Sequence, residues 1–337
     1  MYFFSNDCKF FQSNELYNVY DGLDIFIAEE LSRKFESTII ILRDDVRLLR
    51  FKESLNSINK DLNVLDFPAW DCLPFDRISP NTKILGKRVS TLNNLSNIKD
   101  KKNTVLLTTV SSVLQRVPPK SFFKSNSLLI KTGDRFSQSK LIEYFINNGY
   151  FRTSIVHESS EYSIRGGLID VFPPGNEYPV RIDFFGEEVE SIRNFDPINQ
   201  LTLGNVDIIL FNSGSEIILN DESINLFRNN YRKNFGIPKE SDKIYHSISE
   251  KQFFPGMEHW LPLFYSKLNK IFDYLLDSPI LLDKDILSAI NLRIEETQDL
   301  YLSRKELVDQ KDSLNNLISL GSMYLSKEEI NLQFKDR

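Results

Sequence analysis

The first third of the chain alternates between short apolar runs and stretches whose apolar residues recur at helical spacing. The runs are rich in β-branched and aliphatic residues, as buried parallel strands are, and they lie at 37–42, 62–67 and 103–110. Helical periods occupy the residues around them, at 15–35, 46–58 and 84–95. Asp44 and Asp45 precede the second of these helices, where N-cap acceptors are favoured. Strands that alternate with helices predict an α/β layer built on a parallel sheet.

The middle of the chain has a different pattern. One helical period at 138–147 is followed by several strand-like segments, and turn signals separate them at Asn148-Gly149, Gly166-Gly167 and 173–175. One helix followed by adjacent strands predicts a small α+β domain, which ends near 211–216. We expect this domain to be inserted into the first one.

The last third returns to helical periods. We expect helices at 221–235, 242–253 and 261–275, a strand at 278–283, and a polar helical region after it. The predicted organisation is therefore a first α/β segment at 1–125, an inserted domain at 126–212, and a mainly helical second segment at 213–337 that packs on the first.

The predicted strand at 180–185 has an unusual outward face. Val180, Ile182 and Phe184 share one parity and form a face that can be buried. The other parity places Phe185 on the same face as Arg181 and the carboxylate Asp183. A phenylalanine among charged residues can pack under a loop, with Arg181 paired only to Asp183 or Glu187, or it can contact a partner.

Composition and charge narrow the class of protein. The 337 residues carry a formal net charge of −6, which argues against a protein whose whole surface binds nucleic acid. Two cysteines, Cys8 and Cys72, are too few for a disulfide framework or a zinc site. The N-terminus lacks the pattern of a signal peptide, and no apolar run is long enough to span a membrane. These features predict a cytoplasmic protein with reduced thiols and no membrane contact.

No enzyme signature is found in the sequence. A Walker loop needs glycines and a lysine before Ser or Thr, whereas the nearest candidate, at 85–88, reads LGKR. We interpret Lys87 and Arg88 as a solvent-exposed helix face. The pair Asp221-Glu222 follows an apolar run, as a magnesium-binding carboxylate can, but Asn220 or Asp221 is better explained as a helix cap.

Candidate metal and nucleophile sites are also missing. His157, His246 and His259 lack ligand spacing, and no base is evident near Cys72 in the sequence. We therefore predict no metal, no cofactor and no catalytic residue.

Four stretches together resemble the N-terminal region of the bacterial transcription-repair coupling factors, the Mfd family. They occur in the family's order and read FPAWDCLPFDRISPNTKILGKRVSTLNNL (67–95), VSSVLQRVPP (110–119), EYSIRGGLIDVFPPGNEYPVRIDFFGEEVESIRNFDPINQ (161–200) and FFPGMEHWLPLFY (253–265). The resemblance covers roughly residues 15 to 280.

The resemblance implies a fold and a partner. In that family this region copies three domains of the excision-repair helicase UvrB: a degenerate RecA-like domain in two chain segments and a small inserted domain. The inserted domain docks UvrA, and the positions that match the family's docking residues are Arg165, Arg181 and Phe185. The copy has lost ATP hydrolysis, in keeping with Gly22 and no lysine at the Walker position here. RNA polymerase and DNA would be contacted only through domains outside this chain.

Two alternatives to a UvrA-docking module stay open. One is a residual nucleotide-dependent helicase or translocase part, or a nuclease, that uses Lys87, Asp221 and Glu222. The other is an autoinhibitory module, because the resemblance implies that the parent protein's C-terminal domain masks the docking surface.

Overall fold

The computed structural model describes residues 22–98, 100–310 and 316–335. Its strands are β1 (Ser37–Leu42), β2 (Asn63–Phe67), β3 (Thr104–Thr109), β4 (Leu128–Lys131), β5 (Phe151–Arg152), β6 (Glu161–Arg165), β7 (Leu168–Val171), β8 (Val180–Phe185), β9 (Glu188–Phe195), β10 (Thr202–Asn205), β11 (Ile208–Phe211) and β12 (Ile280–Leu282). Its α-helices are α1 (Leu23–Lys34), α2 (Asp45–Ile58), α3 (Thr82–Asn97), α4 (Val110–Leu114), α5 (Lys120–Ser125), α6 (Gln138–Asn147), α7 (Asp221–Phe235), α8 (Lys243–Ser249), α9 (Ile286–Gln310), α10 (Leu320–Met323) and α11 (Lys327–Lys335).

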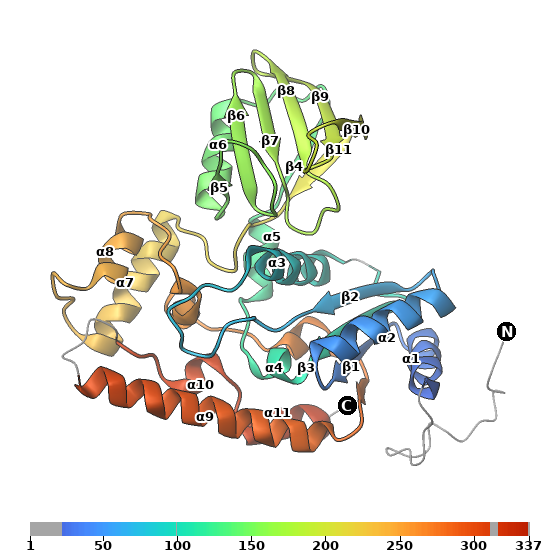
Figure 1. Cartoon of the computed structure of the whole chain (residues 1–337), viewed down its shortest axis with the longest axis vertical. Helices are drawn as coiled ribbons and strands as arrows, with labels where there is room; N and C mark the ends of the chain where they lie inside the picture. The colour runs from blue at the N-terminus through green and yellow to red at the C-terminus, as the bar shows by residue number, and fades with distance from the viewer. Residues whose placement is uncertain (1–21, 99, 311–315, 336–337) are drawn as a thin grey trace.

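A four-stranded parallel sheet forms the larger part of the molecule, in the order β12-β1-β3-β2 (Figure 1). β1 and β3 are buried at every position, as their continuous apolar character predicts. Ile40 and Leu42 pack toward α1 and α2, whereas Ile39 and Ile41 pack toward α3, α4 and α9. The α/β class and the first-segment strands predicted from the sequence are confirmed; residues 15–21 of the first predicted helix lie outside the described residues.

The parallel sheet combines strands from the first and the second segment of the chain. β12 lies beside β1 in parallel, with Ile39 opposite Ile280, although the two strands are far apart in the sequence. The predicted strand at 278–283 therefore completes the sheet, so the second segment contributes more than a cover of helices.

The second segment is less helical than its sequence pattern indicates. The predicted helix at 261–275 is wrong: two 3₁₀ turns, η2 (Met257–Leu263) and η3 (Ile271–Tyr274), stand there instead. Pro262 lies inside η2 and cannot donate a backbone hydrogen bond, which opposes a continuous α-helix. The apolar residues still pack, into a core rich in aromatic side chains. The predicted cap is confirmed, because Asn220 accepts a hydrogen bond from the Ser223 N–H at 2.8 Å.

The inserted region stands beyond α3 as a mixed six-stranded sheet, in the order β10-β9-β8-β7-β6-β5 (Figure 1). Only β5 and β6 run parallel; the other neighbours are antiparallel. β4 and β11, the first and last strands of the region, pair with each other as a separate ribbon. Leu141 and Phe145 of α6 pack on the sheet and complete a second core.

Arg88 is wholly buried, which corrects its interpretation as part of a solvent-exposed helix face. Its Nε donates to Glu216 Oε1 at 2.5 Å, its Nη1 donates to the Pro68 carbonyl, and its guanidinium lies 4.1 Å from the centroid of the Phe67 ring. Both charged side chains are inaccessible to solvent. Glu216 is the point at which the chain leaves the inserted region, so this ion pair ties the junction to α3.

Two glycines bring the inserted loops against α3. A Cβ on Gly175 would lie 1.9 Å from Ser90 Oγ, and one on Gly86 would lie 2.6 Å from Ser159 Oγ. Gly175 also has φ of +84°, which disfavours any other residue. The loops around 159 and 175 therefore face α3, and the hairpin turns at the other ends of these strands point away from it.

We predict that Arg88→Met lowers the free energy of unfolding by about 3–5 kcal/mol, because it leaves the Glu216 carboxylate buried without its partner. Urea denaturation followed by circular dichroism measures the change. The double variant Arg88→Met, Glu216→Leu should recover much of the loss.

Lys87→Met is the matched control, because Lys87 is partly exposed and pairs with Asp66 at 2.8 Å. We expect a cost below about 1 kcal/mol for this variant. An equal loss in both single variants would show that the buried pair has no special role.

Candidate docking surface on the inserted sheet

The face of the inserted sheet that turns away from α6 carries all three residues predicted to dock a partner. In β8 the inward residues Val180 and Ile182 are fully buried, as the alternation predicts. On the other face Phe185 is 79% exposed, so it does not pack under a loop. β6 and β8 run in the same direction, so Arg165 and Phe185 end their strands at the edge farthest from α3.

A buried carboxylate organises the two arginines. Asp170 of β7 is 1% exposed and faces Arg181 across the β7–β8 ladder. Arg181 donates from Nε at 2.7 Å and from Nη2 at 2.9 Å, a bidentate contact, and Arg165 donates to the same carboxylate. The hydrogen bonds from Arg181 to Asp170 are the largest cause that raises the pKa of Arg181 above its usual value. Arg181 therefore pairs with Asp170, which rules out the alternative in which it pairs only with Asp183 or Glu187.

The aromatic ring of Phe195 packs against the guanidinium group of Arg181. The guanidinium lies 4.7 Å from the ring centroid, within the range of a cation–π contact, and Phe195 is fully buried. Arg181 is only 16% exposed as a result, whereas Arg165 is 52% exposed. Phe185 and Arg165 are therefore the more exposed of the three side chains, and Arg181 is mostly covered.

Two tight turns follow Arg165 and Phe185 at the outer edge of the inserted sheet. Gly166 and Gly167 form the turn between β6 and β7, and Gly166 has φ of +61°. The Gly167 carbonyl accepts from the Phe184 N–H at 2.9 Å, and a Cβ on Gly167 would come within 2.9 Å of the Phe184 carbonyl oxygen. The turn that the sequence predicts at these two glycines is confirmed. Gly186, with φ of +63°, follows Phe185 and begins the next turn.

Asp170 and Phe195 are the residues that the sequence analysis missed. Both lie in the stretch 161–200 that carries the family resemblance, and a single acid in the apolar strand LIDV is a signal of a buried charge with a partner. Strand pattern alone does not identify the partner, because the arginine that pairs with this acid depends on the register of two hairpins.

Two of the three groups considered for nucleotide chemistry, Lys87 and Asp221, have structural partners. Lys87 pairs with Asp66, and the exposed Asp221 pairs with Lys251 at 2.8 Å. No cluster of three or more metal-binding side chains is found within residues 22–98, 100–310 and 316–335. Over the same residues no helix is long and apolar enough to cross a membrane.

One expectation about cysteine chemistry needs correction. A base does lie near Cys72, because His259 Nε2 is 3.7 Å from its sulfur. Burial raises the pKa of the Cys72 thiol to about 12, with Asp71 and Glu258 adding to the shift, and burial lowers the pKa of His259. The thiol is therefore held in its unreactive form. Cys8 lies outside the described residues.

Comparisons with known proteins match a family to the same part of the chain. The family described as the UvrB interaction domain matches residues 128–216, which include the inserted sheet and the docking edge. The chain is homologous to the N-terminal region of transcription-repair coupling factors, Mfd. The factor of Haemophilus influenzae is 32% identical over 322 residues, which are 94% of this chain and 27% of that protein. The factor of Escherichia coli is 30% identical over 311 residues, 92% of this chain and 26% of that protein. The chain thus spans about a quarter of the length of these relatives of Mfd type.

We predict that Arg181→Ala lowers the free energy of unfolding by about 1–3 kcal/mol, because the buried Asp170 loses its bidentate partner. Arg165→Ala should cost less than about 1 kcal/mol, because Arg165 is half exposed. Thermal denaturation of both variants measures the difference. Equal stability of the two variants would contradict the supporting role of Arg181.

We predict that Cys72 reacts slowly with iodoacetamide. In a Cys8→Ser background at about pH 8, a thiol pKa near 12 leaves roughly a thousandfold less thiolate than an ordinary thiol has. The native chain should be alkylated far more slowly than the chain in urea, and the rate should still rise above pH 10. A rate that levels off near pH 9 would reveal an activated thiol.

Proposed function

We propose that this chain is a non-catalytic, UvrB-like module of a transcription-repair coupling factor, which docks UvrA and so recruits nucleotide excision repair to stalled transcription. The observation that carries the proposal is the exposure of Phe185 and Arg165 at the same edge of the inserted sheet, where Asp170 pairs with Arg165 and Arg181, within the region matched by the UvrB interaction domain. A bulky ring exposed next to an arginine is typical of interface hot spots.

The larger domain supports a UvrB-like origin. Its parallel sheet is built from two chain segments with the inserted sheet between them, the arrangement that a degenerate RecA-like domain would have. At the position of a Walker loop the chain has Gly22 at the start of α1 and no lysine nearby. We infer that the domain is a scaffold without ATP hydrolysis.

The partner surface follows from the docking edge. Phe185 offers apolar area that a pocket can bury, and the half-exposed Arg165 can donate charge-assisted bonds to a carboxylate. Because Arg181 is mostly covered, it contributes through its remaining exposed edge and through the position it gives Arg165 and Asp170. DNA and RNA polymerase are proposed to be contacted by other parts of the parent protein.

We predict that Phe185→Ala weakens binding of the cognate UvrA by about 2 kcal/mol, roughly thirtyfold, because the ring is lost from a desolvated contact. The fold should be unaffected, since the side chain is 79% exposed. Calorimetric titration of UvrA into each variant measures the change.

Ile198→Ala is the matched control, because Ile198 is an exposed apolar residue of the same domain at 87% exposure. This variant should bind like the unchanged chain. Unaltered binding by a folded Phe185→Ala variant would overturn the assignment of the site, and no binding by any variant would overturn the docking function of the isolated chain.

A further inference from the structure

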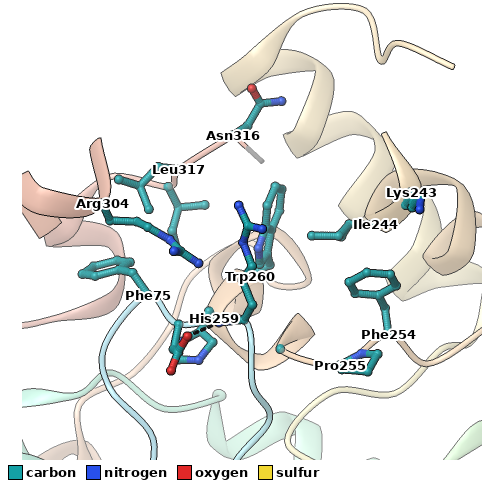
Figure 2. A pocket seen from close by; sticks show the side chains of 14 residues that line it. Phe75, Lys243, Ile244, Phe254, Pro255, His259, Trp260, Arg304, Asn316 and Leu317 are labelled. Carbon is teal, nitrogen blue, oxygen red and sulfur yellow. Dashed lines mark hydrogen bonds between the residues drawn. The ribbon is translucent and has the colours of Figure 1, made fainter. Parts of the chain in front are cut away.

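A cavity of about 350 Å³ opens outside the inserted region, and the docking surface does not account for it. Its walls come from segments far apart in the sequence: the loop before α3, the start of α8, η2, α9 and the residues before α10 (Figure 2). All of its lining residues lie outside the stretch matched by the UvrB interaction domain. The size lies at the lower end of the range for small-molecule sites.

The interior of the cavity is apolar. Trp260 lines it, and in Figure 2 this residue lies between Ile244 and Phe254 on one side and Phe75 and Leu317 on the other. Tyr231 stacks against Trp260 at 5.8 Å and fixes the orientation of the indole ring. A flat apolar group that enters here would contact aromatic walls whose positions are already set.

The rim of the cavity has an excess of positive charge. Arg77, Lys243 and Arg304 line it, and Asp76 is its single acid. Arg304 points from α9 toward Trp260 (Figure 2). Burial is the main cause that lowers the pKa of Arg304, and the nearby Arg77 adds to it more than Asp76 opposes it. Charges of one sign gathered at a partly buried site attract an anion.

The loop that bears Arg77 is fixed in place. A Cβ on Gly256 would lie 2.7 Å from the Arg77 carbonyl carbon, and Gly256 has φ of +80°, so glycine is required on both counts. The Gly256 N–H donates to Ser79 Oγ at 2.8 Å, and Ser79 in turn donates to the buried Glu258 at 2.7 Å. Phe75, a bulky residue, is held at φ of +61°, a strained conformation that is common at ligand sites.

We propose that this cavity is a binding site for a small organic anion with an aromatic ring, such as a ring that bears a phosphate or a carboxylate. The ring would lie against Trp260 and Phe254, and the anionic group would meet Arg304 and Lys243 at the rim. Guanidinium and ammonium groups are the residues that recognise such anions. This proposal is independent of the docking function.

The experiment uses the tryptophan fluorescence of the chain itself. The protein has two tryptophans, Trp70 and Trp260, and both report on this region. Trp260 lines the cavity, and the ring centroid of Trp70 lies 5.4 Å from that of His259, another lining residue. AMP and 2-naphthoate serve as aromatic anions, adenosine as the neutral ring, and inorganic phosphate as the anion without a ring. We expect AMP or 2-naphthoate to bind below millimolar concentration and at least tenfold more tightly than adenosine or phosphate. Calorimetry checks that the optical change is binding.

Arg304→Gln should weaken the aromatic anion about tenfold through loss of a charge-assisted contact, and leave adenosine unchanged. Lys305→Gln is the matched control, because it removes the same charge from the next residue of α9, which does not line the cavity. Failure of both aromatic anions to bind would overturn the proposal, as would equal binding of adenosine and AMP, or an equal effect of the two variants.

Discussion

The buried ion pair between Arg88 and Glu216 is the constraint on which the arrangement of the two sheets depends. Two opposite charges without access to water are tolerable only when each stays within reach of the other. Arg88 belongs to α3, and Glu216 follows the last strand of the inserted region. Tyr265 donates to the Glu216 carbonyl at 2.5 Å and brings in the second segment. Three parts of the chain therefore meet at one desolvated contact.

The close approach of the inserted loops to α3 also limits how the inserted sheet can be placed on the larger domain. With Gly86 and Gly175 packed against Ser159 and Ser90, the strands of the inserted sheet start from a fixed base. The opposite edge, which bears Arg165 and Phe185, is the part farthest from the helices of the larger domain. Since Asp170 also pairs with both arginines, a partner that binds there would meet guanidinium groups that are already positioned, and the entropic cost of ordering them on binding would be smaller.

Local pattern predicted the strands of the parallel sheet and most of the helices outside 261–275, and long-range pairing explains the side-chain contacts that it missed. The segments 37–42 and 104–109 are strands because six consecutive buried positions suit only the interior of a parallel sheet. Arg88 was misjudged because its surroundings in the sequence are ordinary for an exposed helix face, while its partner lies 128 residues away. His259 lies 187 residues from Cys72, so their contact had no sequence signal either.

The same distinction applies to the docking surface. Alternation in β8 predicted which face would hold Arg181 and Phe185, and the family resemblance selected these residues. The pattern did not reveal that Arg181 is mostly covered and serves Asp170, because that depends on the register of β7 against β8 and on the ring of Phe195. The roles of the three predicted residues in UvrA binding stay predictions.

The position of β12 has a consequence for how the chain folds during synthesis. Ser37 at the start of β1 contacts Ser278, 241 residues later, so the parallel sheet cannot be completed until nearly the whole described chain has left the ribosome. At about 5–20 residues per second, β1 waits roughly 12–50 s for this neighbour. The inserted sheet has all of its strands much earlier, by Phe211. We therefore expect the smaller sheet to be formed first and to be carried, already folded, on a larger domain that is still assembling.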